Sequence, residues 1–356
     1  MGKAAKKNDQ GPLAGLDADM VREWFRITHL GRLIEDKAYL YIRAAKGWSY
    51  HAPFAGHDGI QLALGQAFRA NKDFLFPYYR DLLTCLAAGL SVDEILMNGL
   101  SKDGDVAGGG RHMSNHFAKP EIGIQNVSSC TGNHTLHAVG VARAIKYYES
   151  DGIAYSSQGE ASTSEGYVYE ALNGASREKL PVIFVIQNNG FGISVPVSQQ
   201  SANARVSDNY RGLANLKIIN VDGTDFVDCH NGMQEAIAHV RTGEGPVLLH
   251  AQCVRIGAHS NSDRHTLYRS DEEISEAESH DPLPKLRQAL IEAGLMTEDE
   301  LVAVEEANAA ALAEAAERVE ASPDPDPSSV DTFVEPTPWQ TEETPTPETG
   351  DKWKLR

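Results

Sequence analysis

Apolar and polar positions alternate along the chain with two periods, one typical of helices and the other of strands. From Asp17 to Ala45 the apolar residues recur at helical spacing, which predicts a long amphipathic helix. A stretch rich in glycine and aromatic residues follows, and FLFPYYRD (74–81) then reads as an extended segment. Helical spacing also occurs at 60–68, 82–100, 282–294 and 296–322.

One region predicts a strand, a helix and a second strand in immediate succession. GIAYSS (152–157) and VIFVIQ (182–187) have strand character, and SEGYVYEALNGASREKL (164–180) between them has helical character. Crossovers of this kind almost always join parallel strands. The two strands are therefore expected to lie in one parallel sheet.

Two further strands are predicted at KIINVDG (217–223) and PVLLHAQCV (246–254), with a helix over 225–243. Together these patterns predict an α/β fold with a central, mostly parallel sheet flanked by helices, and with extra helices at both ends. Residues 1–15 are expected to be disordered, 16–321 to form one domain, and 322–356 to be a proline-rich acidic tail or linker. Trp339 and Trp353 in this tail suggest that it docks on a surface.

Composition narrows the class of protein. The chain has 356 residues, of which 41% are hydrophobic, and a formal net charge of −18, which argues against a nucleic-acid partner. The N-terminal residues do not read as a secretory leader, and no apolar run has membrane-spanning length, so we expect a cytoplasmic protein. Four cysteines without a CxxC pair are read as reduced thiols.

Polar residues with candidate chemistry follow both strands of the strand–helix–strand unit. Glu160 comes after the first strand and Asn189, 29 residues further on, after the second. In parallel sheets ligands bind beyond the carboxyl ends of the strands, so these side chains are expected to converge. Carboxylate and amide oxygens suit Mg²⁺ or Ca²⁺, and a phosphorylated cofactor would complete the coordination. The predicted helix beginning near Ser164 would point its positive end to the same place.

Each residue also has an alternative explanation when taken alone. Glu160 could interact with the dipole of the following helix, and Asn189-Gly190 could form a hairpin turn. A non-catalytic Rossmann-like binding module would have the same strand–helix–strand unit. These alternatives remain open at the level of periodicity and spacing.

The ordered motifs resemble the alpha subunit of thiamine-diphosphate-dependent 2-oxo acid dehydrogenases, the decarboxylating first component. GEASTSEGYVYEALNGASREKLPVIFVIQNNGFGIS resembles the thiamine-diphosphate motif, and five others appear in order: AGHDGIQ, FPYYRD, GGGRHMS, SSCTGNHTLHAVG and RIGAHSNSDRHTLYRS. The resemblance runs from about Arg22 to about Ser270. It implies a thiamine-diphosphate-binding fold.

The resemblance also implies roles for individual residues. The side chains of Glu160 and Asn189 and the carbonyl of Phe191 would bind Mg²⁺. His259 would contact the cofactor diphosphate and act in catalysis, donating a proton during acyl transfer. The remaining cofactor-binding positions are Tyr79, Arg80, Ser129, Thr131, Ala161 and Ser162. Taken alone, Arg80 could instead pair with a carboxylate such as Asp81, and His259 could be a solvated loop residue.

Some positions depart from the family pattern. Most family members have Asp where Glu160 stands, and branched-chain members resemble this chain in having Glu. Ala161 replaces a glycine. Gln187 replaces a cationic residue that contacts the diphosphate, so that contact would be neutral or absent. His112 and His116 are read as walls of the active site rather than as a metal pair. Ser260 corresponds to a residue that some eukaryotic relatives phosphorylate, and the sequence leaves its regulation open.

The implied activity is that of an oxidoreductase in branched-chain amino acid catabolism. It would oxidatively decarboxylate 3-methyl-2-oxobutanoate and pass the acyl group to lipoamide. The implied partners are a beta subunit, in an α2β2 heterotetramer, a lipoyl-bearing acyltransferase and a small 2-oxo acid substrate. Catalysis would require the beta subunit, because the glutamate that activates the cofactor is expected there, on a separate or a fused chain. A pyruvate or acetoin dehydrogenase alpha subunit is the nearest alternative.

Overall fold

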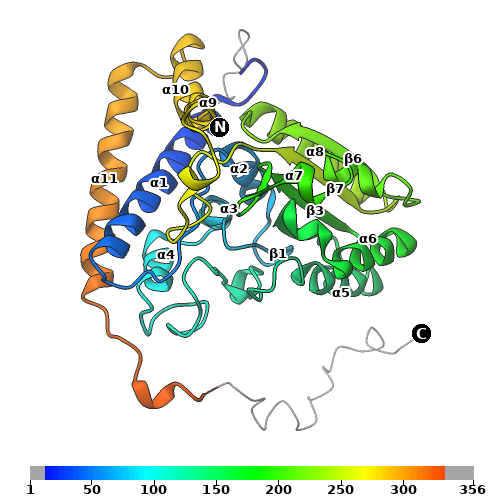
Figure 1. Cartoon of the computed structure of the whole chain (residues 1–356), viewed down its shortest axis with the longest axis horizontal. Coiled ribbons are helices and arrows are strands. Elements are labelled where there is room, and N and C mark those ends of the chain that lie inside the picture. The colour runs from blue at the N-terminus through cyan, green and yellow to red at the C-terminus, as the bar shows by residue number, and fades with distance from the viewer. Residues whose placement is uncertain (1–12, 333–356) are drawn as a thin grey trace, which may run out of the picture.

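A computed structural model of the chain describes residues 13–332. Its centre is a five-stranded sheet in the order β1-β2-β3-β7-β6, and every neighbouring pair is parallel. Figure 1 shows this sheet enclosed by helices. The strands are β1 (Phe74–Phe76), β2 (Ala154–Gly159), β3 (Val182–Asn188), β6 (Lys217–Asp222) and β7 (Val247–Gln252). The predicted α/β fold is confirmed.

The strand–helix–strand unit forms as predicted. Helix α6 (Gly166–Glu178) joins β2 to β3, and the two strands run parallel in a register that pairs Gly159 with Gln187. Every residue of β3 is buried. Its side chains alternate between two cores: Ile183 and Val185 belong to the larger cluster, and Phe184 to the smaller one on the other face. A strand covered on both faces explains the unbroken apolar run VIFVI in the sequence.

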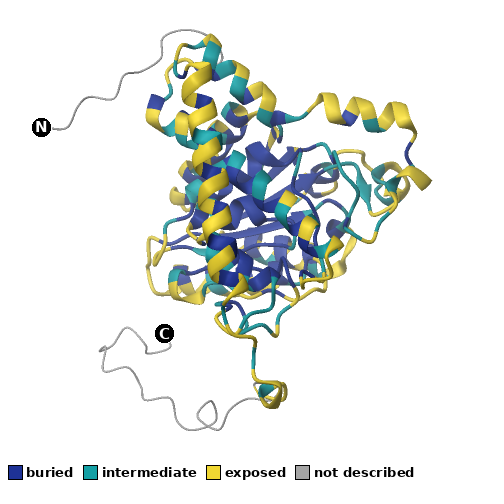
Figure 2. Cartoon of the chain, turned by 90° about the vertical axis from the view of Figure 1, so that its left-hand side faces the viewer, coloured by how far each residue is buried: buried dark blue, intermediate teal, exposed yellow. Residues whose placement is uncertain are grey.

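Helices cover both faces of the sheet and add a separate layer on one side. Helix α5 packs on α6, and α8 packs against β6, β7 and α2. The long helix α1 lies beside α10 and α11, as Figure 1 shows. In Figure 2 the outer faces of this layer are exposed while the strands behind it are buried. The bounds are α1 (Ala18–Arg43), α2 (Asp58–Ala67), α5 (His134–Tyr147), α8 (Phe226–Arg241), α10 (Pro282–Glu292) and α11 (Glu298–Glu320).

Two features differ from the sequence prediction. The segment 82–100 is not one helix but two, α3 (Leu82–Ala88) and α4 (Val92–Gly99). Gly89 adopts a φ of 116°, a left-handed conformation that ends α3, and Ser91 then caps α4 through a reciprocal pair of bonds with Glu94. A further helix, α9 (Asp271–Ser279), follows Ser270, which caps it in the same way.

The chain continues past α11 as a segment that we call the C-terminal strap, residues 321–332. It contains one 3₁₀ turn, Pro327–Ser329, and lies against the glycine-rich loop 101–111. The rest of the predicted tail, including Trp339 and Trp353, lies outside the described residues, as do residues 1–12. Within residues 13–332 no helix is both long and apolar enough to cross a lipid bilayer.

Candidate active site

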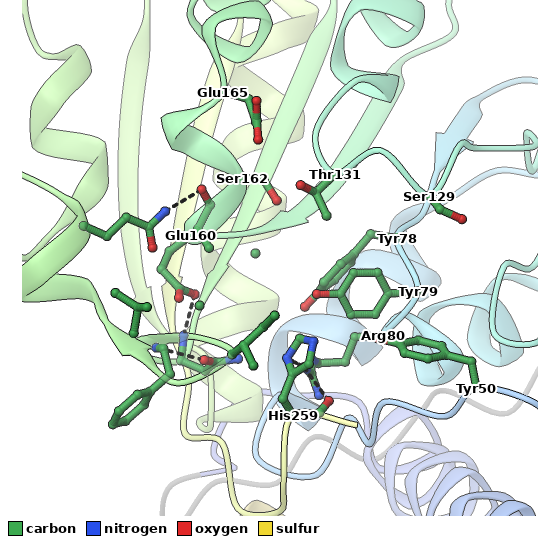
Figure 3. Close-up of a pocket in the computed structure, with 18 of the residues that line it drawn as sticks. Tyr50, Tyr78, Tyr79, Arg80, Ser129, Thr131, Glu160, Ser162, Glu165 and His259 are labelled. Carbon is green, nitrogen blue, oxygen red and sulfur yellow. Dashed lines mark hydrogen bonds between the residues drawn. The ribbon is translucent and has the colours of Figure 1, made fainter. Parts of the chain in front are cut away.

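A cavity of about 600 Å³ opens at the carboxyl ends of β2 and β3. This volume is typical of sites that bind small molecules. All ten residues predicted to bind cofactor or metal line it: Tyr79, Arg80, Ser129, Thr131, Glu160, Ala161, Ser162, Asn189, Phe191 and His259. Figure 3 shows Glu160 across the cavity from Tyr79 and Arg80. The predicted convergence at one edge of the sheet is therefore found.

Glu160 and Asn189 are direct neighbours at this edge. Glu160 follows β2 immediately, and Asn189 follows β3. The backbone N–H of Asn189 donates to Glu160 Oε2 at 3.2 Å. The parallel register brings the two residues together, because it sets Gly159, the last residue of β2, beside Gln187, the last residue but one of β3.

The Glu160 carboxylate is suited to bind a cation. The residue is only 2% exposed, and its Oε1 has no hydrogen-bond donor. Burial raises the pKa of this carboxyl, since the charged form loses its hydration. A divalent cation would compensate for that loss. A role confined to the helix dipole would not require an unpartnered oxygen facing a cavity.

Asn189 and Phe191 are held by a tight turn that leads into a hairpin. Asn189 Oδ1 accepts from the Phe191 N–H at 3.2 Å, and Gly190 between them has a φ of 85°. The hairpin pairs β4 (Phe191–Gly192) with β5 (Val195–Pro196). The Arg255 guanidinium lies 5.1 Å from the centre of the Phe191 ring. These contacts fix the backbone whose carbonyl is a candidate metal ligand.

Arg80 brings positive charge into the cavity. It is 2% exposed, and within the described part of the chain it forms no ion pair with a carboxylate. Its Nη1 donates to the Pro53 carbonyl, and its Nε has no partner. Asp81 instead accepts from Tyr78 N–H and from Gln187. The alternative of an Arg80–Asp81 ion pair is therefore wrong, and the guanidinium is suited to bind an anion such as a phosphate.

His259 lies against Arg80 and is not a solvated loop residue. Its backbone N–H donates to Asp263 Oδ2 at 2.8 Å, and its ring lies edge-on to that of Tyr79, with centroids 6.0 Å apart. Burial, together with the positive charges of Arg80 and Arg255, lowers the pKa of His259 to about 4. The ring is therefore neutral at physiological pH.

Arg80 also identifies the tautomer of His259. Its Nη2 lies 3.4 Å from His259 Nδ1 and 3.3 Å from the His259 carbonyl. A guanidinium can only donate, so Nδ1 accepts. The single proton of the neutral ring then lies on Nε2, where it can be donated.

Neighbouring groups hold the other predicted residues. Gln200 Nε2 donates to the Ala161 carbonyl at 2.7 Å, and the Tyr167 hydroxyl donates to the Thr131 carbonyl at 2.8 Å. Ser129 Oγ lies 3.1 Å from His116 Nε2. Ala161 and Ser162 belong to a 3₁₀ turn, Ala161–Ser164, that precedes α6.

The two histidines of the glycine-rich loop differ in position. His116 lines the cavity as predicted, whereas His112 is not among the lining residues; their ring centroids are 5.2 Å apart. The prediction that His112 forms a wall is therefore wrong.

Sequence reasoning missed several lining residues. Tyr50 and Met113 reach the cavity from two separate loops, Gln200 reaches it from the end of the short helix α7 (Val197–Gln200), and Tyr78 stands next to the predicted Tyr79. The repeated tyrosine in FPYYRD could have drawn attention to Tyr78, and Met113 lies within the motif GGGRHMS, but no motif marks Tyr50 or Gln200. Gln187 is fully buried and is not among the lining residues, in keeping with an absent diphosphate contact.

The parallel sheet and this cavity define an α/β enzyme whose site combines a buried carboxylate with a buried guanidinium. Comparison with known proteins identifies the family of this enzyme. A family model described as "Dehydrogenase E1 component" matches residues 26–328. The chain belongs to this family of thiamine-diphosphate-dependent oxidoreductases, which confirms its resemblance to the 2-oxo acid dehydrogenase alpha subunits.

Individual relatives support the same placement. The chain is 33% identical over 289 residues to the 2-oxoisovalerate dehydrogenase subunit alpha of Bacillus subtilis, a match that covers 80% of this chain and 86% of the relative. It is 33% identical over 263 residues to the 3-methyl-2-oxobutanoate dehydrogenase subunit alpha of Mycobacterium tuberculosis, covering 74% and 68%. It is 30% identical over 330 residues to the pyruvate dehydrogenase E1 component subunit alpha of Zymomonas mobilis, covering 91% and 92%.

Proposed function

We propose that this chain is the alpha subunit of a branched-chain 2-oxo acid dehydrogenase that uses thiamine diphosphate and Mg²⁺. The observation that carries the proposal is one cavity with a buried, unpartnered carboxylate oxygen on Glu160 and a buried guanidinium on Arg80. A metal–diphosphate group needs both charges. The names of the relatives from Bacillus subtilis and Mycobacterium tuberculosis favour a branched substrate such as 3-methyl-2-oxobutanoate.

The donor set fits such a cofactor. Glu160, Asn189 and the carbonyl of Phe191 would hold the metal ion, since all three offer oxygen atoms. The diphosphate would be bound by Tyr79, Arg80 and His259, and by backbone at Ala161 and Ser162. Ser129 and Thr131 would contact the aminopyrimidine ring through their backbone. When bound, the cofactor supplies the nucleophilic carbon and the electron sink for decarboxylation of a 2-oxo acid.

His259 would serve as the proton donor of this site. Its tautomer leaves the proton on Nε2, and Arg80 holds the ring from the Nδ1 side. Because the ring is neutral, a bound diphosphate can accept a hydrogen bond from Nε2–H without the ring having to titrate. The same proton is available when the acyl group is transferred.

The rim of the cavity supports a protein partner. Met113, Ile193 and Val195 line the cavity and are 46%, 55% and 43% exposed. Apolar side chains at the mouth of a polar site are suited to contact a second chain. We infer that a beta subunit covers this rim in an α2β2 assembly, and that residues 16–321 form the domain it binds. A lipoyl-bearing acyltransferase would then accept the acyl group, and the complex would act in the cytoplasm.

The deciding experiment is reconstitution with the beta chain followed by a substrate comparison. We expect faster turnover of 3-methyl-2-oxobutanoate than of pyruvate, with lipoamide as acceptor. Preference for pyruvate would favour a pyruvate dehydrogenase alpha subunit, an alternative supported by the Zymomonas mobilis relative, which matches 91% of this chain. Preference for acetoin would favour an acetoin dehydrogenase.

Cofactor binding tests the other class of function. Calorimetric titration of the assembled protein should show thiamine diphosphate binding that depends on Mg²⁺. A Rossmann-like binding module without catalytic function would bind no thiamine diphosphate, or would bind it without regard to the metal.

A further inference from the structure

His57 lies directly behind the candidate metal site and is not one of its predicted ligands. It precedes α2 and is fully buried. Its Nδ1 lies 2.8 Å from Gln187 Oε1, and its Nε2 lies 3.2 Å from Asn189 Nδ2. The ring therefore bridges the last residues of β3 to the loop that carries a candidate metal ligand.

The partners of Gln187 fix the direction of the first hydrogen bond. Gln187 Nε2 donates to Asp81 Oδ1 at 2.6 Å, which turns Gln187 Oε1 toward His57. Gln61 Nε2 donates to the same Oε1 at 3.0 Å, and its own orientation is set by the Arg80 carbonyl, also at 3.0 Å. Gln187 Oε1 is thus an acceptor, and His57 Nδ1 must carry the proton that it receives.

The second hydrogen bond follows from the first. A ring protonated on Nδ1 accepts at Nε2, so Asn189 must present its NH₂ group to His57. This leaves Asn189 Oδ1 on the other side of the amide, where it accepts from the Phe191 N–H. If the amide were reversed, NH₂ hydrogens would occupy the position of the oxygen and would repel a cation.

The adjacent asparagine has the same arrangement without lining the cavity. Asn188 Nδ2 lies 3.1 Å from Nε2 of His250, which is 1% exposed, and Asn188 Oδ1 accepts from Gly190 N–H at 3.0 Å. Each asparagine is therefore oriented by its own buried histidine. Only Asn189 lines the cavity with Glu160, so His250 provides a matched control.

The backbone holds His57 in place from two sides. A Cβ at Gly56 would lie 1.8 Å from the Val254 carbonyl oxygen, so only glycine permits this close approach to the segment after β7. On the other side Arg32 Nε and Nη2 donate to the two oxygens of the buried Asp58 at 2.7 and 2.9 Å. The histidine therefore has little freedom to move away from Asn189.

We propose that His57 is a positioning residue that orients the Asn189 amide so that its oxygen, and not its nitrogen, faces a divalent metal ion. The inference rests on the proposed function, because it takes Asn189 as a metal ligand. Ligands are commonly oriented by such outer partners, whose loss typically weakens metal binding about 10–100-fold.

The test separates the two sides of the ring. In His57→Asn the amide can reach the position of Nδ1 but not that of Nε2, so the contact with Gln187 is kept and that with Asn189 is lost. In His57→Gln the longer side chain reaches the position of Nε2. Mn²⁺ binding to the protein assembled with its beta chain and thiamine diphosphate would be measured by electron paramagnetic resonance of the free ion.

We expect H57N to raise the half-saturating Mn²⁺ concentration about 10–100-fold, and H57Q to bind close to the wild-type concentration. H250N should bind Mn²⁺ as the wild type does, even where it lowers the unfolding temperature. Wild-type Mn²⁺ binding in H57N, or equal weakening in H57N and H57Q, would overturn the inference. If H57N does not assemble, H57Q decides: affinity near wild type supports the role, and a loss above about tenfold contradicts it.

The outcome for the proposed function is read separately. If the wild-type assembly binds no Mn²⁺ in the presence of thiamine diphosphate, the proposed function fails. If it binds Mn²⁺ and H57N does so equally well, only the role of His57 fails.

Discussion

At the scale of single residues, the most informative feature is buried charge with few partners. Glu160 has a carboxylate oxygen without a donor, and Arg80 has a guanidinium nitrogen without an acceptor. Leaving either group buried and uncompensated is unfavourable by several kcal/mol. Their position in one cavity indicates that a ligand carrying both signs of charge stabilises them.

Glu160→Gln should abolish metal-dependent cofactor binding. The substitution keeps the size of the side chain but removes the charge that attracts the cation. We expect the half-saturating thiamine diphosphate concentration at fixed Mg²⁺ to rise by more than about 100-fold, beyond the effect of losing an outer partner. Glu170→Gln, on the exposed face of α6, is the matched control. Normal cofactor affinity in E160Q, measured by calorimetry, would refute the ligand assignment.

His259→Ala should separate binding from transfer. The cofactor retains Arg80 and the metal ligands, so its affinity should fall only a few-fold, whereas acyl transfer to lipoamide should slow by about 10²–10⁴-fold, the usual contribution of a positioned acid or base. Single-turnover decarboxylation and lipoamide acylation would be timed separately. Equal slowing of both steps would argue against a proton-donor role in transfer.

Residue-level prediction succeeded where a motif couples chemistry to position in the chain. Glu160 and Asn189 end neighbouring strands, so the strand pattern alone predicted that they meet. Tyr50 and His57 could not be found this way, because their contacts depend on how loops pack. Tyr50 lies against Tyr79 and Ser114, and His57 lies against Gln187 of β3. No periodicity in the sequence encodes that packing.

At the scale of elements, the apolar pattern predicts most boundaries of helices and strands. Where that pattern is ambiguous, capping residues determine where a helix begins or ends. The pattern over 82–100 reads as one helix because both halves have helical spacing. The left-handed Gly89 and the capping box at Ser91 break it in two. These signals are visible in the letters AGLS, but only when turn chemistry is weighed against periodicity.

The C-terminal strap ties the glycine-rich loop to the end of α11. Lys102 Nζ lies 2.8 Å from Asp324 Oδ1, and Arg111 Nη2 donates to Ser329 Oγ at 2.8 Å. The Asp103 N–H donates to the Pro323 carbonyl at 3.1 Å. This loop leads directly into Met113 and His116, which line the cavity.

A double substitution, Asp324→Ala with Ser329→Ala, should loosen the loop without unfolding the domain. Exposed ion pairs contribute less than about 1 kcal/mol, so the unfolding temperature should hardly change. Amide hydrogen exchange within 103–111 should become faster, and its measurement by mass spectrometry checks the prediction. Glu306→Ala, an exposed acid on α11, is the control. Unchanged exchange in the double variant would mean that the loop is ordered by its own contacts.

At the scale of the whole molecule, the sheet divides the interior into two apolar cores and gathers polar groups at one edge. The larger core extends from the sheet to α1 and α11, and the smaller lies under α5 and α6. The polar edge includes histidines that burial keeps neutral. A fall in pH should therefore change the stability of the fold as well as the charge of the site.

Stability should fall between pH 7 and pH 5. Burial lowers the pKa of His51, His134 and His250 to about 4, below the usual 6.5. These neutral rings contribute fully to the free energy of unfolding above pH 6.5. The contribution is lost as the pH falls toward 4, by about 1.4 kcal/mol per pH unit for each net proton. Burial likewise lowers the pKa of His57 and His259. Burial raises the pKa of Asp81 to about 6, that of Glu35 to about 8 and that of Glu160 above its usual value, which opposes this trend through fewer groups.

Thermal unfolding at the two pH values measures the net effect. We expect a lower midpoint at pH 5. His134→Gln should reduce the difference between the two midpoints by the contribution of one histidine. A midpoint that rises on acidification would contradict the prediction.

The alternation of β3 between two cores restricts how this chain can change in evolution. Inserting one residue before Gln187 would turn every later side chain of the strand to the opposite face and displace Asn189 from the cavity. Gene variants that add or delete a single codon there should abolish activity. The turn after α8 is restricted too: a side chain at Gly243 would meet no atom within 4 Å, but a Cβ at Gly245 would lie 2.1 Å from the Asn215 carbonyl oxygen.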